Sequence, residues 1–370
     1  MEFKSETTHL GLKRTVTEES RVNIQERISL ARRTLYSLIK TGVHGTNGLN
    51  ARTSCKIYQV YVIPRLLYGL ETIHLQNRDI SELCSFHLST LKQIQSLPNR
   101  TATSAVYLLL GVLPITAELH KRQLSLFHAI ATSENNSMRE IAWRQHSIGR
   151  PNSFFVKIVD ILSIYKLPTF GQIMNGHYKK LDWKILVRNS VNSYWNVKLK
   201  QECKEKTTLS FLATEQLAIG KTHNVWNTVS NSVTDVRKAV TKARMATGTY
   251  LLQVHKVKFN QAEVDTTCPI CQTEDEDLIH VLTSCSAYRD IRMSKFQKIK
   301  EYVISEIGKN IWSSCFNNKR NITQLIVDCQ SFIQSKIIPD KKEVLASIEI
   351  MTRDYCHTIH LKRLQILGAL

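Results

Sequence analysis

The pattern of apolar and polar positions predicts helices along most of the chain. Between residues 21 and 40, apolar side chains recur every three or four positions, as on one face of a helix: Ile24, Ile28, Ala31, Leu35 and Leu38. The same periodicity predicts helices over about 51–63, 77–94, 103–110 and 114–130. We expect Pro64 to bend or end the second helix and Gly111 to end the fourth. Five helices with short connectors predict a compact bundle.

The rest of the chain carries a weaker pattern. Serine, asparagine and threonine cluster at 132–137 and 222–235, which predicts linkers or loop tips, with aromatic residues and helical fragments between them. A basic helix is expected from Asp235 to about Leu252. Residues 294–370 place apolar side chains at helical spacing and predict three more helices. The expected fold class is therefore mainly α.

Composition agrees with long helices, because the 370 residues include only 13 glycines and 7 prolines. Hydrophobic residues make up 42%, which allows a sizeable core and excludes a collagen-like or disordered chain. Nine cysteines without regular spacing argue against a secreted disulfide framework. The longest apolar run, Ala105 to Ile115, has 11 residues. We therefore expect an intracellular chain without a membrane span, in either nucleus or cytoplasm.

Positive charge points to an anionic partner. Lysine and arginine (50) exceed aspartate and glutamate (31) by 19. In the helix over 21–40 we expect four cations to contact nucleic-acid phosphates, with a solvated helix face as the alternative: Arg27, Arg32, Arg33 and Lys40. Further phosphate contacts are predicted at Arg237, Lys238, Lys242, Arg244, Lys256, Lys258, Arg289 and Arg292.

One group of cysteine and histidine residues has the spacing of a metal site. Cys268, Cys271, His280 and Cys285 are spaced C-x₂-C-x₈-H-x₄-C, and thiolate sulfur with imidazole nitrogen is the ligand set that tetrahedral zinc prefers. Four protein ligands leave no open position for water, so the predicted cofactor is a structural zinc ion. The acidic run 274–277 is interpreted as the first turn of the helix that carries His280, where the helix dipole favours carboxylates.

The sequence lacks several motifs that mark common enzymes. It contains no HExxH, no GxxxxGK[ST], no GxSxG and no adjacent pair of aspartates. We therefore expect no enzymatic activity from this chain as it stands and no small-molecule substrate. The sequence makes no prediction about oligomeric state.

Several runs carry a resemblance across nearly the whole chain. The most specific are IYQVYVIPRLLYGLE at 57–71, TGTYLLQ at 247–253 and KFN at 258–260, followed by the zinc spacing with Glu276, Asp277 and Arg289. These runs resemble the thumb and the C-terminal zinc-binding region of non-LTR retrotransposon reverse transcriptases. The run 9–12 is similar to the strand that closes the polymerase core in that family, and Arg353, His360 and Arg363 resemble later parts of its zinc-binding region.

The resemblance implies a fragment of such an enzyme. The fingers, the palm and the Tyr/Phe-x-Asp-Asp quartet of the family have no counterpart here, so only the four zinc ligands transfer. The expected segments are a remnant polymerase-core strand or arm (1–20), a thumb-like helical bundle (21–131), a helical connector (132–235), a basic helix with the zinc-binding knuckle (236–300) and C-terminal helices (301–370).

The expected function is that of a zinc-containing nucleic-acid-binding protein without polymerase activity. It would bind RNA or an RNA–DNA duplex through phosphate contacts, with weak sequence preference and steep salt dependence. Three alternatives stay open. The chain is a piece of an active RNA-directed DNA polymerase polyprotein, or aromatic residues of 150–200 form a protein-binding surface, or the chain is a non-functional remnant.

Overall fold

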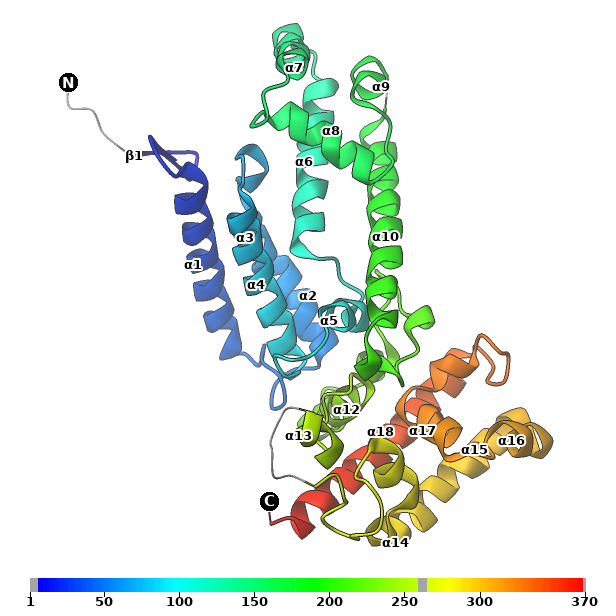
Figure 1. Cartoon of the computed structure of the whole chain (residues 1–370). Helices are drawn as coiled ribbons and strands as arrows, with labels where there is room; N and C mark the ends of the chain where they lie inside the picture. Colours follow the sequence, from blue (N-terminus) through cyan, green and yellow to red (C-terminus); the bar gives the residue numbers. More distant parts are fainter. Residues whose placement is uncertain (1–5, 177, 259–264, 369–370) are drawn as a thin grey trace. The chain divides into compact units, whose positions relative to one another are not determined.

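The protein is mainly helical, as expected (Figure 1). The computed structural model describes residues 6–176, 178–258 and 265–368, without the side chain of Lys258. Helices hold 68% of the residues and strands 3%. The chain forms two compact units, each built from three stretches: unit 1 contains 1–43, 55–91 and 112–198, and unit 2 contains 44–54, 92–111 and 199–370. These units follow packing and not the order of the chain, so the five expected segments stay predictions.

Unit 1 begins with a small antiparallel hairpin. Strand β1 (Glu6–His9) pairs with β2 (Leu12–Thr15), and the turn between them has left-handed backbone at Leu10 and Gly11. The side chain of Asn23, in α1 (Glu19–Ile39), accepts from the Lys13 amide at 3.0 Å and donates to its carbonyl at 2.8 Å. This amide pair fixes β2 on α1, because both backbone groups of Lys13 receive a partner from one side chain.

The first helices of unit 1 largely follow the predicted pattern. They are α1, α2 (Ala51–Tyr61), whose first turn belongs to unit 2, α3 (Ile63–Leu67), η1 (Leu70–Thr72) and α4 (Asn77–Ile94), whose last turn also belongs to unit 2. Pro64 stands in the first turn of α3, where its missing N–H costs nothing. Gly69 has φ +76°, and a Cβ there would lie 2.6 Å from a methyl carbon of Leu12. This close approach requires glycine between α3 and η1.

Aromatic residues form a second core in unit 1. It lies among α6 (Ile115–Ala131), α7 (Asn136–Ile148), α8 (Phe154–Ile164), α9 (Phe170–Asn175) and α10 (Lys180–Lys204, which runs on into unit 2) (Figure 1). Phe127 stacks on Phe170, their ring centres 5.1 Å apart. Trp183 donates from Nε1 to the Leu124 carbonyl at 3.1 Å, which joins α10 to α6. The aromatic residues predicted in the connector therefore act mainly as packing residues.

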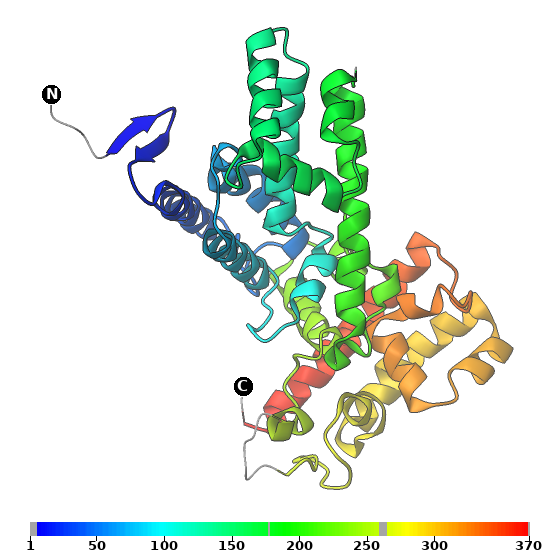
Figure 2. The ribbon, with the colours of Figure 1, turned by 45° about the horizontal axis from the view of Figure 1, so that its top comes forward.

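Unit 2 is organised around its last helix, α18 (Lys342–Ile366), which packs against α12 (Val233–Ala246), α15 (Gln297–Ile307) and α17 (Lys319–Val327) (Figure 2). The shorter elements are α5 (Thr103–Leu110), η2 (Thr207–Leu209), η3 (Thr214–Gln216), α11 (Asn224–Asn227), α13 (Gln253–Lys258), η4 (His280–Ser284), η5 (Ser286–Tyr288), α14 (Arg289–Ile291), η6 (Arg292–Phe296), α16 (Lys309–Cys315) and η7 (Cys329–Phe332). Four α-helices follow residue 294, one more than expected. Among the described residues no single helix is long and apolar enough to cross a membrane, although α5 and α6 taken together reach that length and composition.

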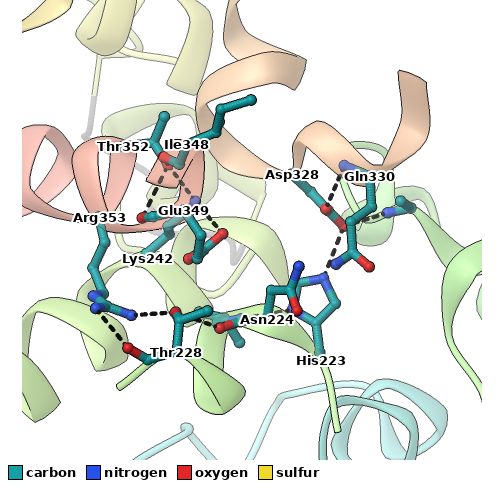
Figure 3. A network of polar contacts seen from close by, with 12 residues as sticks. His223, Asn224, Thr228, Lys242, Asp328, Gln330, Ile348, Glu349, Thr352 and Arg353 are labelled. Atoms are coloured by element: carbon teal, nitrogen blue, oxygen red, sulfur yellow. Dashed lines mark hydrogen bonds and ion pairs between the residues drawn. The ribbon is translucent and has the colours of Figure 1, made fainter. Parts of the chain in front are cut away.

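Ion pairs join α18 to α12, and a hydrogen bond joins it to the end of α11 (Figure 3). Lys242 is 1% exposed and donates from Nζ to Glu349 at 2.7 Å and to the Thr352 hydroxyl at 2.6 Å. Arg353 donates to the Thr228 hydroxyl at 2.9 Å and forms an ion pair with Asp235 at 3.0 Å. The prediction that Lys242 contacts nucleic acid is therefore wrong, because its ammonium group is enclosed and neutralised by α18.

A second buried polar group closes the end of α17. The Asp328 carboxylate lies 3.3 Å from His223 Nε2 and accepts the Ala213 amide at 2.8 Å (Figure 3). Burial alone would raise the pKa of Asp328, but the charge and hydrogen bond of His223 and the backbone amides outweigh it, and the pKa is lowered. This carboxylate therefore stays ionised inside unit 2.

A buried histidine gives unit 1 a defined response to acid. His87 in α4 faces Tyr58 in α2, with 2.8 Å between the tyrosine hydroxyl and Nδ1, while Nε2 lies 3.3 Å from the Leu113 carbonyl. Nε2 therefore donates to the carbonyl and Nδ1 accepts from the hydroxyl, which is the neutral tautomer. Burial is the main reason that the pKa of His87 falls from 6.5 to about 4.

We predict that unit 1 loses stability as the pH falls from 6.5 to 4. In this window His87 of the unfolded chain binds a proton, whereas the buried ring of the folded chain stays neutral. The contribution of this group to the free energy of unfolding is therefore complete above pH 6.5 and is lost as the pH falls. The free energy of unfolding should fall by up to about 1.4 kcal/mol per pH unit from this group. NMR titration of the His87 ring should give a midpoint near pH 4; a midpoint near 6.5 would show that the ring is not buried as described.

Candidate metal centre

A short hairpin presents the first two cysteines. Thr267 and Asp275 pair across an antiparallel bridge, and the Cys268 amide donates to the Glu274 carbonyl at 2.8 Å. Between the two arms the chain turns at 269–272, where the Gln272 amide donates to the Cys268 carbonyl at 2.9 Å and Gln272 has φ +54°. The tight turn aims the thiols of Cys268 and Cys271 toward one point.

A wide helical turn presents the other two ligands. Asp277 accepts the His280 amide at 2.7 Å and so starts the turn η4. The Cys285 amide then donates to the His280 carbonyl at 2.9 Å, an i to i+5 bond of the π type. This bond brings the ends of the H-x₄-C spacing to one side of the turn, so that Cys285 lies beside His280.

The four side chains converge on one point. One ligand atom from each of Cys268, Cys271, His280 and Cys285 lies within 4.8 Å of the other three, and Cys271 Sγ is 3.2 Å from His280 Nε2. Three of the four residues are buried and Cys271 is half-buried. This arrangement could hold a metal ion, as the sequence predicts, and its three soft sulfurs favour a thiophilic metal.

Side chains around the ligands prepare them for a cation. His280 Nδ1 donates to Glu274 at 2.8 Å, which leaves the lone pair of Nε2 facing the sulfurs. Burial would raise the pKa of Cys271, but hydrogen bonds from the side chain and amide of Thr273 and from the neighbouring thiols lower it to about 6. Burial and the nearby thiolates raise the pKa of Cys285 to about 12. Without a cation, the neighbouring thiols therefore cannot all lose their protons easily. A metal ion would stabilise all three thiolates together.

The metal-binding segment is tied to α18 by a buried ion pair. Glu276 is fully buried and accepts from Arg363 in bidentate fashion, at 2.8 and 2.9 Å, and also from the Gln253 amide at 2.9 Å. Arg292 donates to the Cys285 carbonyl at 2.6 Å and so satisfies the end of η4. The segment therefore rests on the core of unit 2 through charged groups as well as apolar ones.

The acidic run differs from its expected position. Residues 274–276 belong to the second arm of the hairpin and not to the first turn of a helix, and only Asp277 acts as a helix-starting residue. Glu274 orients the imidazole and Glu276 neutralises Arg363. Both roles were missed because they depend on partners outside the run. The sequence does show that the run lies between the two ligand pairs, and this position could have indicated that its carboxylates contact the ligands.

The predicted cations of unit 1 separate into two groups. Arg27 is 6% exposed, donates to the Gly11 carbonyl and lies over the ring of Tyr68 at 4.9 Å. The prediction of a phosphate contact is wrong for Arg27, because the hairpin turn and the aromatic ring enclose it. Arg32 and Arg33 are exposed on α1, and Lys40 is exposed directly after its last residue.

Most predicted cations of unit 2 contact protein groups. Arg237 donates to Asn47 at 2.7 Å and Lys238 to Asp354. Arg244 is half-buried and donates to the Ser96 carbonyl at 2.8 Å. With Lys242 and Arg292, these side chains stabilise unit 2. Lys256 is half-buried and Arg289 is exposed, and the side chain of Lys258 lies outside the described part of the chain.

Comparison of the chain with protein-family models, with curated proteins and with solved structures found no match. The chemistry of the centre is set by its own residues. They offer three sulfurs and one nitrogen, which together could fill all four positions of a tetrahedral shell around a metal ion. Such a shell can order a segment, but it offers no position for a reacting molecule.

We predict that Glu274→Gln weakens metal binding roughly ten-fold or more, because the imidazole loses its charged partner. The measurement is competition with a metallochromic chelator at pH 7. Glu306→Gln removes the same charge from an exposed position of α15 and serves as the control. Equal affinities for the two variants would contradict the orienting role of Glu274.

We also predict that Arg363→Met destabilises unit 2 by about 3–5 kcal/mol, because Glu276 is left buried and charged without a partner. Glu276→Met combined with Arg363→Met should be less damaging than Arg363→Met alone, since no buried charge remains. Urea unfolding of the unaltered chain, of Arg363→Met and of the double variant gives the free energies of unfolding to be compared. A cost below about 1 kcal/mol for Arg363→Met would show that the pair is exposed to water.

Proposed function

We propose that the four ligands hold a structural zinc ion. Zinc lies about 2.3 Å from thiolate sulfur and about 2.0 Å from imidazole nitrogen, so its ligand atoms stand roughly 3.5–3.8 Å apart. Ligand atoms that already lie within 4.8 Å of one another reach this geometry by small side-chain movements. The hydrogen bond from His280 Nδ1 to Glu274 is the carboxylate–histidine arrangement that supports zinc in many proteins.

We further propose that the chain binds RNA or an RNA–DNA duplex through phosphate contacts, without polymerase activity, as a protein related to the thumb and zinc-binding region of non-LTR retrotransposon reverse transcriptases. Residues that carry this resemblance are in contact with one another in unit 2. Glu276 pairs with Arg363, and the Tyr250 hydroxyl lies 3.0 Å from His360 Nδ1. The shared packing of these distant motifs supports their interpretation as one ancestral region.

The observation that carries the binding proposal is the exposed face of α1. Its solvent-facing residues recur at three- and four-residue spacing: Gln25, Ser29, Arg32, Tyr36 and Lys40. Arg33 adds a further cation beside this row. A straight row of cationic, polar and aromatic side chains suits a phosphate backbone, since guanidinium and ammonium groups contact phosphate oxygens without selecting a base.

Burial weakens the alternative of an aromatic protein-binding surface. In the region 150–200, Phe155, Tyr165 and Trp183 are buried, and Trp183 is bonded to the Leu124 carbonyl. Side chains that fill the core of unit 1 do not contact another protein. Two alternatives stay open, a fragment of an active polyprotein and a non-functional remnant. They concern the origin and the activity of the chain, and the surface of α1 does not distinguish them from the proposal.

We predict salt-dependent retention of RNA. The affinity for a 20-nucleotide RNA and for an RNA–DNA duplex should fall linearly on a log–log plot against salt, with a slope of about −0.7 to −0.9 per phosphate contacted. Replacing Arg32, Arg33 and Lys40 together by glutamine should lower affinity and reduce the size of this slope by up to about 3. Fluorescence polarisation at several salt concentrations measures both quantities.

The matched control removes the same charge elsewhere on unit 1. Arg144, Arg150 and Lys180 are exposed and lie outside α1, so their joint replacement by glutamine should leave the slope nearly unchanged. Absence of RNA retention by the unaltered chain at low salt would contradict the proposed function. Equal effects of the two triple variants would contradict the α1 interface and leave non-specific charge as the cause.

A further inference from the structure

Unit 2 contains a cavity beside the metal-binding segment. Its volume is about 460 Å³. Five segments of unit 2 line it: the loop before α5, η2 with the loop after it, the stretch from the end of α12 into α13, residues 277–279 between the hairpin and η4, and the start of α17. Asp277, which starts η4 through the His280 amide, is also a wall residue of the cavity. The segment that carries the metal ligands therefore also shapes this cavity.

The lining combines an apolar floor with a cationic rim. Apolar side chains of the floor include Phe211, Met245, Leu252 and Ile279. Two guanidinium groups stand at the rim, on Arg100 and Arg320, and both side chains are exposed. Hydroxyl side chains of Thr207, Thr208 and Ser210 also line the cavity. A cavity of this size with a few converging polar groups is typical of a small-molecule site.

Close backbone contacts fix the walls. Gly248 has φ +63°, and a Cβ at this position would lie 2.2 Å from the Thr208 carbonyl oxygen. Only glycine therefore allows the turn after α12 to approach η2 so closely. Arg100 donates to the Thr249 carbonyl at 2.7 Å, which holds its guanidinium group at the rim. The cavity is thus shaped before any ligand arrives.

We propose that this cavity binds one nucleotide unit, with its phosphate at Arg100 and Arg320 and its base against the apolar floor. Guanidinium groups are the preferred protein partners of phosphate, because their planar N–H groups match two phosphate oxygens. Phe211 supplies an aromatic surface, and Arg320 lies 5.2 Å from its ring centre, so an aromatic base and a phosphate find partners side by side. The single carboxylate of Asp277 in the wall disfavours a polyphosphate and favours one phosphate group.

Two sources supply this chemistry, a free mononucleotide and one residue of a bound nucleic-acid strand. The second source rests on the proposed function, whereas the first does not. A strand that follows phosphate contacts elsewhere on the protein would place one unstacked base in the cavity, in the way that single-stranded nucleic acids are bound on aromatic surfaces.

The first experiment uses free AMP and the full chain in calorimetry at 0.15 M salt. AMP should bind saturably and at least about ten-fold more tightly than adenosine or inorganic phosphate, because each of these lacks one half of the recognised group. Ser210→Trp, which fills the cavity from an exposed position, should abolish binding, and Ser210→Ala should retain it. Arg320→Gln should weaken binding roughly ten-fold, while Arg150→Gln, an exposed control in unit 1, should not.

The second experiment uses an eight-nucleotide single-stranded RNA that carries 2-aminopurine. Its fluorescence should change on binding to the unaltered chain and to Ser210→Ala, and should not change with Ser210→Trp. AMP binding without RNA retention would support the nucleotide site and contradict the proposed function. RNA retention with neither AMP binding nor a fluorescence difference between the Ser210 variants would overturn the nucleotide site and leave the proposed function standing.

Discussion

The convergence of three thiols and one imidazole is the constraint on which the segment 265–288 depends. Few apolar side chains of this segment are buried, chiefly Val281, Leu282 and Tyr288, and its hairpin is held by a small number of backbone bonds. Two of its thiols and its imidazole are nevertheless enclosed by protein. Polar and ionisable groups at such density are costly to bury unless a cation neutralises them. Metal binding would therefore supply the free energy that a core of this size lacks.

The same constraint links the centre to the rest of unit 2. Glu276 and Arg363 bring opposite charges together from the hairpin and from α18, and Arg292 satisfies the end of η4. Through Asp277 the segment also contributes to the wall of the cavity. A change at the metal ligands is therefore expected to reach the cavity through η4 and the residues before it, without any movement of the helical core. This connection makes the proposed structural ion relevant to the proposed nucleotide binding as well as to stability.

Burial redistributes the positive charge that the sequence displays. Lys242, Arg353 and Arg363 are ionic partners inside unit 2, and Arg27 is enclosed in unit 1. Each of the three ion pairs removes one cation and one carboxylate from the surface, so the net charge of +19 hardly changes, but fewer than the 50 lysines and arginines of the sequence are exposed. Among the exposed cations that remain, Arg32, Arg33 and Lys40 carry the contacts proposed for the outer face of α1. Net charge alone predicts an anionic partner, and burial decides which cationic side chains are accessible to that partner.

Local patterns predicted what depends on near neighbours in the chain. The spacing of Cys268, Cys271, His280 and Cys285 was sufficient to predict their convergence, because a tight turn and one helical turn place all four. The helices over 21–39, 77–94 and 103–110 likewise follow from periodicity.

The errors have a common physical cause. Arg27 follows Ile24 by three residues and precedes Ala31 by four, so it lies on the apolar face, as Lys242 does between Ala239 and Ala246. Periodicity could have placed both side chains inward. Their partners could not have been found in this way, since Glu349 stands 107 residues after Lys242 and Arg363 stands 87 residues after Glu276. The cavity depends on five such distant segments and has no signature in any one of them alone.

X-ray absorption at the zinc edge of the purified, full-length chain tests the metal centre most directly. One zinc ion per chain should be found, with about three sulfur neighbours near 2.3 Å and about one nitrogen neighbour near 2.0 Å. A chain that folds with no stoichiometric metal, or a spectrum fitted by oxygen and nitrogen neighbours alone, would contradict the assignment of Cys268, Cys271, His280 and Cys285 as the ligands.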